Sequence, residues 1–82
     1  MTGKITAESA ASKIQDIKYV HEGYLTFCII TMRSGFVITG QSACNDPASY
    51  SRETGERNAY KDAFGRLFLM ERYAEKDRQT AE

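Results

Sequence analysis

The hydrophobic residues at the start of the chain are spaced as in a helix. Ala10, Ile14 and Ile17 form a narrow apolar stripe, and Thr6, just ahead of it, is an acceptable N-cap. Alanine is also the best intrinsic helix former, and this stretch contains several alanines. We therefore predict a short helix over residues 6–15.

Strand-like sequence replaces the helical spacing in the next part of the chain. Residues 24–33 are rich in β-branched and aromatic side chains and predict the strongest strand. Weaker strands are predicted before it, at residues 17–20, and after it, at residues 36–43. Ser34-Gly35 suits a tight turn between the last two strands, because glycine tolerates a positive φ. The three strands predict an antiparallel meander.

The strongest predicted strand is hydrophobic on both faces. Side chains alternate along a strand: Leu25, Phe27 and Ile29 share one face, and Tyr24, Cys28, Ile30 and Met32 share the other. A sheet that is covered by helices on one side should alternate more cleanly between apolar and polar residues, and the chain offers one long helix. We therefore expect one face to meet a partner, and we place Ile30 and Met32 in an interface between copies of the chain.

An Asn-Asp-Pro sequence at residues 45–47 marks an abrupt change from strand to helix. A residue before proline favours the extended geometry that an N-cap needs, and proline suits the first helical position. Asp46 is therefore predicted to cap a helical turn over residues 47–50. Ser51 is predicted to cap a second helix, which we place at residues 52–75.

This last helix is predicted to be longer than its own domain needs. Its 24 or so residues span roughly 36 Å, whereas a compact chain of 82 residues has a radius of gyration of about 12 Å. We expect the helix to overhang and to meet a second copy through Leu69 and Tyr73, followed by a polar tail at residues 76–82. The apolar stripe expected to pack on the sheet contains Ala59, Tyr60, Ala63, Phe64, Leu67, Phe68, Met70 and Ala74.

Small residues stand four positions apart near the start of this helix, at Gly55, Ala59 and Ala63. Such spacing allows the close approach of another backbone or of a ligand. The alternative is a helix that tolerates a glycine near its frayed start, where the cost is up to about 1 kcal/mol. Both interpretations stay open.

The elements together predict one α+β domain over residues 1–82, with the meander at 17–43 and the C-terminal helices at 47–75. The chain has 11 basic and 11 acidic residues and a formal net charge of zero, which disfavours a nucleic-acid binder. No apolar run approaches the length of a membrane span, and the start lacks the apolar core of a secretory signal. The two cysteines, Cys28 and Cys44, are interpreted as reduced thiols of a cytosolic protein.

Two cations are the best candidates for a binding site. Arg57 and Lys61 share a helix face and border aromatic positions, so charge and stacking together would suit an anionic, planar ligand. Tyr50 and Asn58 would add hydrogen bonds. The alternative is an ordinary solvated face with an ion pair between Glu53 and Arg57, and the residues alone favour this alternative.

The residues disfavour an enzyme. His21 lies in a predicted turn, and a nucleophile–base pair with Cys44 would need a fold that brings the two together. Asp46 is better explained as a cap than as an acid. The cysteines lack the short paired spacing of zinc sites, and no glycine-rich phosphate loop or nucleophile elbow is present. We expect no metal and no cofactor.

Most of the chain, about residues 20–73, resembles a family of small tailed-phage proteins typified by gene products forty-nine and sixty-six (Shigella phage Sf6 type). The family pattern has a hairpin of the form L-T-x-C…G-F-x-x-x-G-x-S-x-C, then a D-P-x-x-[FY] step, then Gly and Ala in the last helix. A Trp that is common late in the family's helix is missing. The matching residues are Leu25, Thr26, Cys28, Gly35, Phe36, Gly40, Ser42, Cys44, Asp46, Pro47, Tyr50, Gly55 and Ala59.

The resemblance implies a non-catalytic phage or prophage accessory protein in the cytoplasm of a bacterial host. The layout is also similar to type-one Thoeris anti-defence proteins, which bind a cyclic ADP-ribose-type immune signal without cleaving it. This second resemblance implies an oligomeric sponge for a nucleotide-type signal, with Arg57, Lys61, Tyr50 and Phe36 in its pocket. The alternative is a small oligomeric module that binds and inhibits a host protein.

Overall fold

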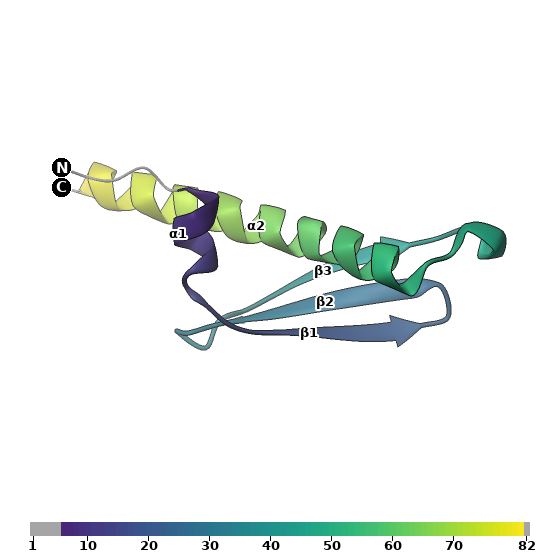
Figure 1. Ribbon diagram of the computed structural model, residues 1–82. Coiled ribbons are helices and arrows are strands. Elements are labelled where there is room, and N and C mark those ends of the chain that lie inside the picture. Colours follow the sequence, from purple (N-terminus) through teal and green to yellow (C-terminus); the bar gives the residue numbers. More distant parts are fainter. Residues whose placement is uncertain (1–5, 82) are drawn as a thin grey trace.

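The protein is an α+β fold in which one long helix covers one face of a small sheet (Figure 1). The structure, a computed structural model, describes residues 6–81 and the side chains of residues 6–74. Among these residues, no helix is both long and apolar enough to cross a membrane. The elements are α1 (Ala7–Ala11), β1 (Ile14–Glu22), β2 (Leu25–Met32), β3 (Val37–Ala43), the 3₁₀ helix η1 (Pro47–Ser49) and α2 (Arg52–Ala81).

The three strands form the predicted antiparallel meander, with β2 in the centre. Two glycines with positive φ make its turns, Gly23 (58°) and Gly35 (94°). Gly23 stands first in the two-residue loop between the paired Glu22 and Leu25, where a tight hairpin turn favours glycine. Each hairpin therefore turns where a glycine permits it.

The strand-to-helix joint has the predicted caps. The Asp46 carboxylate accepts from the backbone N–H of Ala48 at 3.1 Å and begins η1. The Ser51 hydroxyl accepts from the N–H of Thr54 at 3.2 Å, at the start of α2. Both caps satisfy backbone donors that the first helical turn leaves without partners.

Some predicted boundaries are wrong by several residues. Helix α1 ends at Ala11 instead of residue 15, and β1 begins at Ile14 instead of residue 17. The reason is the sheet: Ile14 pairs with Met32, and the N–H of Arg33 donates to the carbonyl of Lys13 at 2.9 Å. These long-range bonds override the local helix propensity. In the same way α2 passes residue 75 and continues to Ala81, since no proline or glycine interrupts it there.

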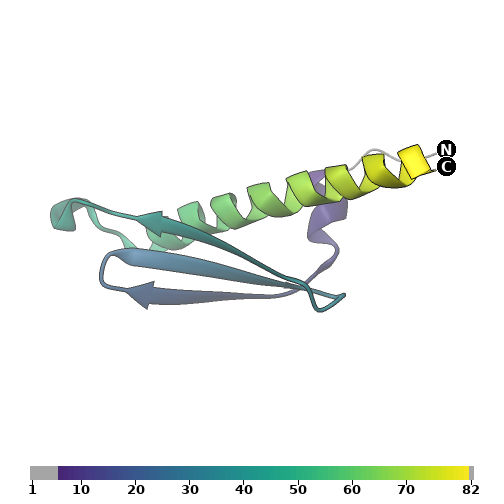
Figure 2. The same ribbon diagram turned by 180° about the vertical axis from the view of Figure 1, so that it is seen from behind.

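Helix α2 overhangs the sheet, as expected. Its thirty residues correspond to about 45 Å, and the molecule is 53 Å long with a radius of gyration of 15.0 Å. Seen from behind, the helix continues well past the β2–β3 turn (Figure 2). Leu69 and Tyr73, both in the C-terminal half of α2, remain 65% and 77% exposed. Their role as a contact between copies stays a prediction.

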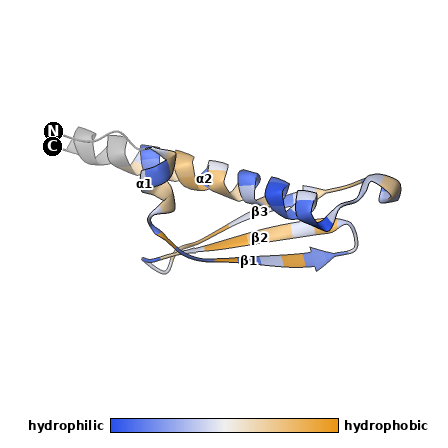
Figure 3. Ribbon diagram, in the orientation of Figure 1, coloured by the Kyte–Doolittle hydropathy of each residue, from blue (hydrophilic) through white to orange (hydrophobic). Residues whose placement is uncertain are grey.

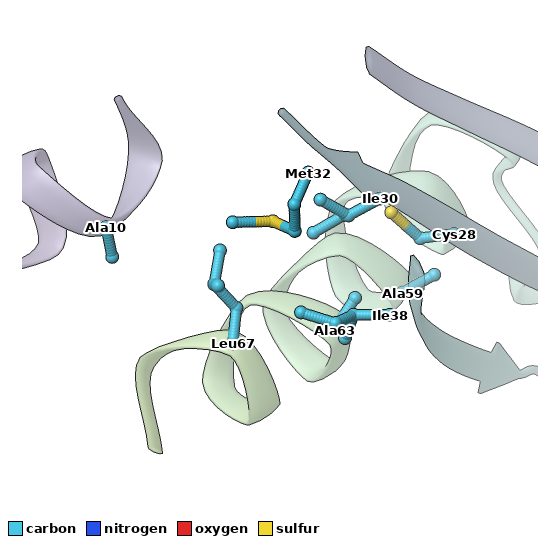
Figure 4. Close-up of a cluster of buried hydrophobic side chains, with 8 residues drawn as sticks. All are labelled: Ala10, Cys28, Ile30, Met32, Ile38, Ala59, Ala63 and Leu67. Carbon is cyan, nitrogen blue, oxygen red and sulfur yellow. The ribbon is translucent and has the colours of Figure 1, made fainter. Parts of the chain in front are cut away.

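The core lies between α2 and the covered face of the sheet (Figure 4). Leu67 points toward Met32, and Ala10 of α1 closes the end of the cluster. Ala59 and Ala63 face Gly40 so closely that a Cβ on Gly40 would lie 2.3 Å from the Ala63 nitrogen. The small residues of the helix therefore admit the backbone of β3. The core residues are Ala10, Cys28, Ile30, Met32, Ile38, Ala59, Ala63 and Leu67.

The assignment of the two faces of β2 to core and partner is wrong. Ile30 and Met32 are 0% and 5% exposed beneath α2, so neither is accessible to a second copy. The opposite face carries Leu25, Phe27 and Ile29, each half-buried, and no described helix covers it. Hydrophobic colour runs along β2 in Figure 3. The alternation of side chains along a strand shows which residues share a face, but it does not show which face the helix will cover.

Candidate functional site

A small polar cavity lies at the strand-to-helix joint, between the end of β3, η1 and the first turns of α2. We call it the joint cavity. Its volume is about 150 Å³. It contains hydroxyl, thiol and amide groups and two aromatic rings, and none of its lining residues carries a formal charge at neutral pH. The lining residues are Tyr24, Ser42, Ala43, Cys44, Ser49, Tyr50, Ser51, Thr54, Gly55 and Asn58.

Two tyrosines form the aromatic side of the joint cavity. The ring centres of Tyr24 and Tyr50 are 5.2 Å apart, with the planes tilted by 56°. This geometry is within the favoured range for aromatic pairs. Tyr24 lies in the β1–β2 turn, and Tyr50 is the C-cap of η1, so the pair connects the joint to the sheet.

A histidine-centred network lies behind Tyr50. His21 Nε2 is 2.7 Å from a carboxylate oxygen of Glu56, and His21 Nδ1 is 3.3 Å from the hydroxyl oxygens of both Thr26 and Tyr50. A carboxylate accepts the proton of Nε2, so in the neutral imidazole Nδ1 accepts from a hydroxyl. Arg52 adds a longer ion pair to the same Glu56 oxygen at 3.8 Å. The network joins β1, β2, the joint and α2.

Gly55 makes this network possible. A Cβ at residue 55 would lie 2.7 Å from the Thr26 hydroxyl oxygen, so a larger residue would displace this hydroxyl or push α2 away from β2. The close approach buries Thr26 completely, and its hydroxyl finds a partner in His21. At Gly55, as at Ala59 and Ala63, a small residue therefore allows α2 to pack closely on the sheet.

The network resembles a nucleophile, a base and an orienting acid, but the candidate nucleophile is inaccessible. Thr26 is 0% exposed, so no substrate can reach its hydroxyl. Cys44 is committed elsewhere, because its thiol donates to the carbonyl of Asp46 at 3.2 Å. Within the described residues, no group of three histidine, cysteine or acidic side chains is placed to hold a metal ion. The arrangement is better suited to fixing the Tyr50 hydroxyl beside the joint cavity.

A larger cavity lies at the other end of the sheet, where the β2–β3 hairpin meets the overhanging helix. This hairpin cavity has a volume of about 490 Å³ and a mainly apolar lining. An ion pair between Lys13 and Glu71, 2.5 Å long, crosses its rim. Its lining residues are Lys13, Met32, Arg33, Ser34, Phe36, Ile38, Leu67, Met70, Glu71 and Ala74.

The structure brings together only two of the five predicted ligand-binding residues. Tyr50 and Asn58 line the joint cavity, whereas Phe36 lines the hairpin cavity. The two cavities are separated by the eight residues of β2, about 25 Å. Arg57 and Lys61 are exposed on α2 and line neither cavity.

Sequence reasoning missed several residues of this site. Tyr24, Thr26 and Glu56 were not predicted to belong to it, although Thr26 matches the family pattern. His21 and Glu56 lie 35 positions apart, and only the fold joins them. Helix α2 also has its ion pairs elsewhere than predicted, at Arg52–Glu56 and Asp62–Arg66.

Three weak acids lie near one another between the sheet and α2: Cys28 is buried, and Tyr19 and Tyr60 are half-buried. Burial raises the pKa of the Tyr19 hydroxyl, and the negative charges of ionised Cys28 and Glu56 raise it further. Burial also raises the pKa of the Cys28 thiol and of the Tyr60 hydroxyl. All three groups therefore hold their protons more tightly in the folded chain than in the unfolded chain.

This cluster predicts a loss of stability at alkaline pH. The contribution is fully present below the unfolded pKa values, 9.0 for cysteine and 10.0 for tyrosine. It is lost as the pH rises through the higher folded values, because the unfolded chain releases its protons first. Thermal melting between pH 7 and pH 10.5 should show the fall. Tyr60→Phe should flatten it, whereas Tyr73→Phe, at an exposed site, should not; equal slopes in both variants would contradict the prediction.

Comparison with known proteins gives one clear match. The model of the family described as "Phage protein (N4 Gp49/phage Sf6 gene 66) family" matches residues 3–78. No curated protein and no solved structure gave a significant match. The similarity to Thoeris anti-defence proteins is therefore not shown by these comparisons.

Proposed function

We propose that this phage accessory protein, a member of the phage protein (N4 Gp49/phage Sf6 gene 66) family, binds and sequesters a cyclic nucleotide-type immune signal. The binding site is the joint cavity. The observation that carries the proposal is its lining, in which two tyrosine rings stand among hydroxyl groups and the Asn58 amide.

Such a lining suits a nucleobase and its sugar. Aromatic side chains stack on bases, and each stacked base contributes about 1–3 kcal/mol. Hydroxyl and amide groups donate to and accept from base edges and ribose hydroxyls. The Tyr50 hydroxyl is held by His21, so part of the cavity is ordered before a ligand arrives.

The size of the cavity indicates how much of the ligand it holds. Ligand sites usually measure about 300–1,000 Å³, and the joint cavity measures about 150 Å³. It therefore takes one base or one ribose, and the phosphates lie outside it. Arg57 and Lys61 remain candidates for contacting these phosphates, because both are exposed on the helix that carries Asn58.

Calorimetry with cyclic ADP-ribose and with cyclic di- and trinucleotides tests the proposal. Tyr50→Ala should weaken binding about tenfold to a hundredfold, because a stacking partner is lost. Asn58→Ala should weaken it less. Phe36→Ala is the matched control: it removes a ring from the hairpin cavity and should leave the affinity unchanged.

Two results would overturn the proposal. One is the absence of binding heat with all of these ligands at micromolar protein concentration. The other is binding that Phe36→Ala abolishes and Tyr50→Ala does not, which would move the site to the hairpin cavity. The host-protein alternative stays a prediction, and the uncovered face of β2 is the surface it would use.

A further inference from the structure

The two edge strands of the sheet, β1 and β3, differ in whether side chains hydrogen-bond to their outward backbone groups. On β3, two of the outward backbone groups are occupied by helix side chains: the N–H of Gln41 donates to the Asp62 carboxylate at 3.0 Å, and Arg66 donates to the carbonyl of Thr39 at 3.0 Å. Asp62 and Arg66 also form an ion pair at 3.4 Å. Side chains of α2 therefore occupy the middle of this edge and hinder its pairing with another strand.

The β1 edge has no such cover. Backbone groups in an antiparallel ladder point alternately toward and away from the neighbouring strand. Glu22 and Leu25 close a two-residue hairpin, so Glu22, Val20 and Lys18 bond to β2. The N–H and C=O groups of the intervening residues then point outward. No side chain of the described residues hydrogen-bonds to these outward groups, which belong to Ile17, Tyr19 and His21.

We propose that the β1 edge binds the β1 edge of a second copy of this chain. The two strands run antiparallel about a twofold axis perpendicular to the sheet, and the two sheets become one sheet of six strands. Tyr19 lies opposite its own counterpart, and Ile17 lies opposite His21 of the second copy. Both α2 helices then cover the same face of the joined sheet.

Hydrogen bonding selects this register. When Tyr19 lies on the axis, all six outward groups of each strand find partners. When Ile17 lies on the axis, the outward groups of His21 stay unpaired, and the ladder runs into the irregularity between Ile14 and Asp16. The second register would place Asp16 opposite Lys18, whereas the first places Asp16 opposite Glu22. Exposed charge pairs are worth less than a row of backbone hydrogen bonds.

The exposed area of the chain fits a missing partner. The chain exposes 5955 Å², whereas a compact monomer of 9.2 kDa exposes about 4,900 Å². The overhang of α2 accounts for part of the excess of roughly 1,000 Å², and the whole excess is similar to what one protein contributes to an interface of standard size. Ile17, 37% exposed on the helix side of β1, would be covered by the second copy.

The register with Tyr19 on the axis can be tested by disulfide formation between two variants that each carry one introduced cysteine. Lys18 of one chain lies opposite Val20 of the other, and both side chains are exposed on the face away from the core. Lys18→Cys and Val20→Cys, purified separately and mixed under mild oxidation, should give a cross-linked dimer. Each variant alone should give only the background of the native Cys28 and Cys44. A mixture of Asp16→Cys with Lys18→Cys reports the rejected register and should not cross-link.

A second variant tests the edge itself. Ile17→Pro removes one outward N–H and no hydrogen bond of the chain's own ladder, so the fold should survive. Light scattering should then report a monomer where the unaltered protein is a dimer, with an unchanged circular dichroism spectrum. The proposal is overturned if the unaltered protein is a monomer, if Ile17→Pro remains a dimer, or if only the Asp16→Cys mixture cross-links.

Discussion

Replacing Gly40 with alanine is expected to lower the free energy of unfolding by about 3 kcal/mol, at the upper end of the usual cost of overpacking. The new Cβ would lie 2.3 Å from the Ala63 nitrogen and 2.6 Å from the Ala59 carbonyl oxygen. Both are backbone atoms, so no side chain can rotate away to make room. Strand β3 and helix α2 would have to separate, and the contact on which the core depends would loosen.

Gly65→Ala is the matched control for Gly40→Ala. Nothing lies within 4 Å of a Cβ at Gly65, which is exposed on α2. Alanine should stabilise the helix there by about 0.5–1 kcal/mol, since glycine is the weaker helix former. Urea denaturation at one protein concentration measures both changes. If both variants shift the midpoint in the same direction, the close approach of β3 to α2 does not explain why residue 40 is a glycine.

Leu67→Ala is expected to cost about 3 kcal/mol, within the range for emptying a buried leucine site. Leu67 is 1% exposed and points toward Met32 in the core cluster (Figure 4). Its removal leaves a cavity where α2 passes the last residues of the sheet. A small domain is stable by only about 5–15 kcal/mol, so the loss should be plain in a denaturation curve.

Leu69→Ala removes the same atoms two residues away. Leu69 is 65% exposed, and truncation of an exposed side chain normally changes stability by less than about 0.5 kcal/mol. The pair of variants therefore separates burial from residue type. A loss at Leu69 as large as that at Leu67 would show that a second chain covers Leu69, which is the predicted role of this residue.

Local sequence determined the elements and the joint. The Asp46 cap, the glycine turns and the central strand depend on residues within a few positions of one another, so propensity and turn chemistry were sufficient to predict them. The ends of α1 and β1 were predicted wrongly for the opposite reason. Residues 12–17 are compatible with either structure, and pairing of Ile14 with the distant Met32 decides between them.

The candidate site also contains some residues that local sequence predicts and others that only the fold brings together. Tyr50 and Asn58 were predicted and do line one cavity, because they lie close in sequence on the joint and the helix that follows it. Phe36 was assigned to the same site by residue type and lies at the other end of β2. Tyr24 reaches Tyr50, and His21 reaches Glu56, only because the β1–β2 hairpin folds back under the start of α2.

Local sequence is sufficient to predict three strands and one over-long helix, and to predict that the small residues of that helix allow a close neighbour. The fold identifies this neighbour as the chain's own Gly40, and it places Ile30 and Met32 inward and Phe27 outward. Local sequence cannot make this choice, because alternation along β2 makes both faces apolar enough to be buried. The choice between them is fixed by where α2 fits against β3, at the one strand position that has no side chain.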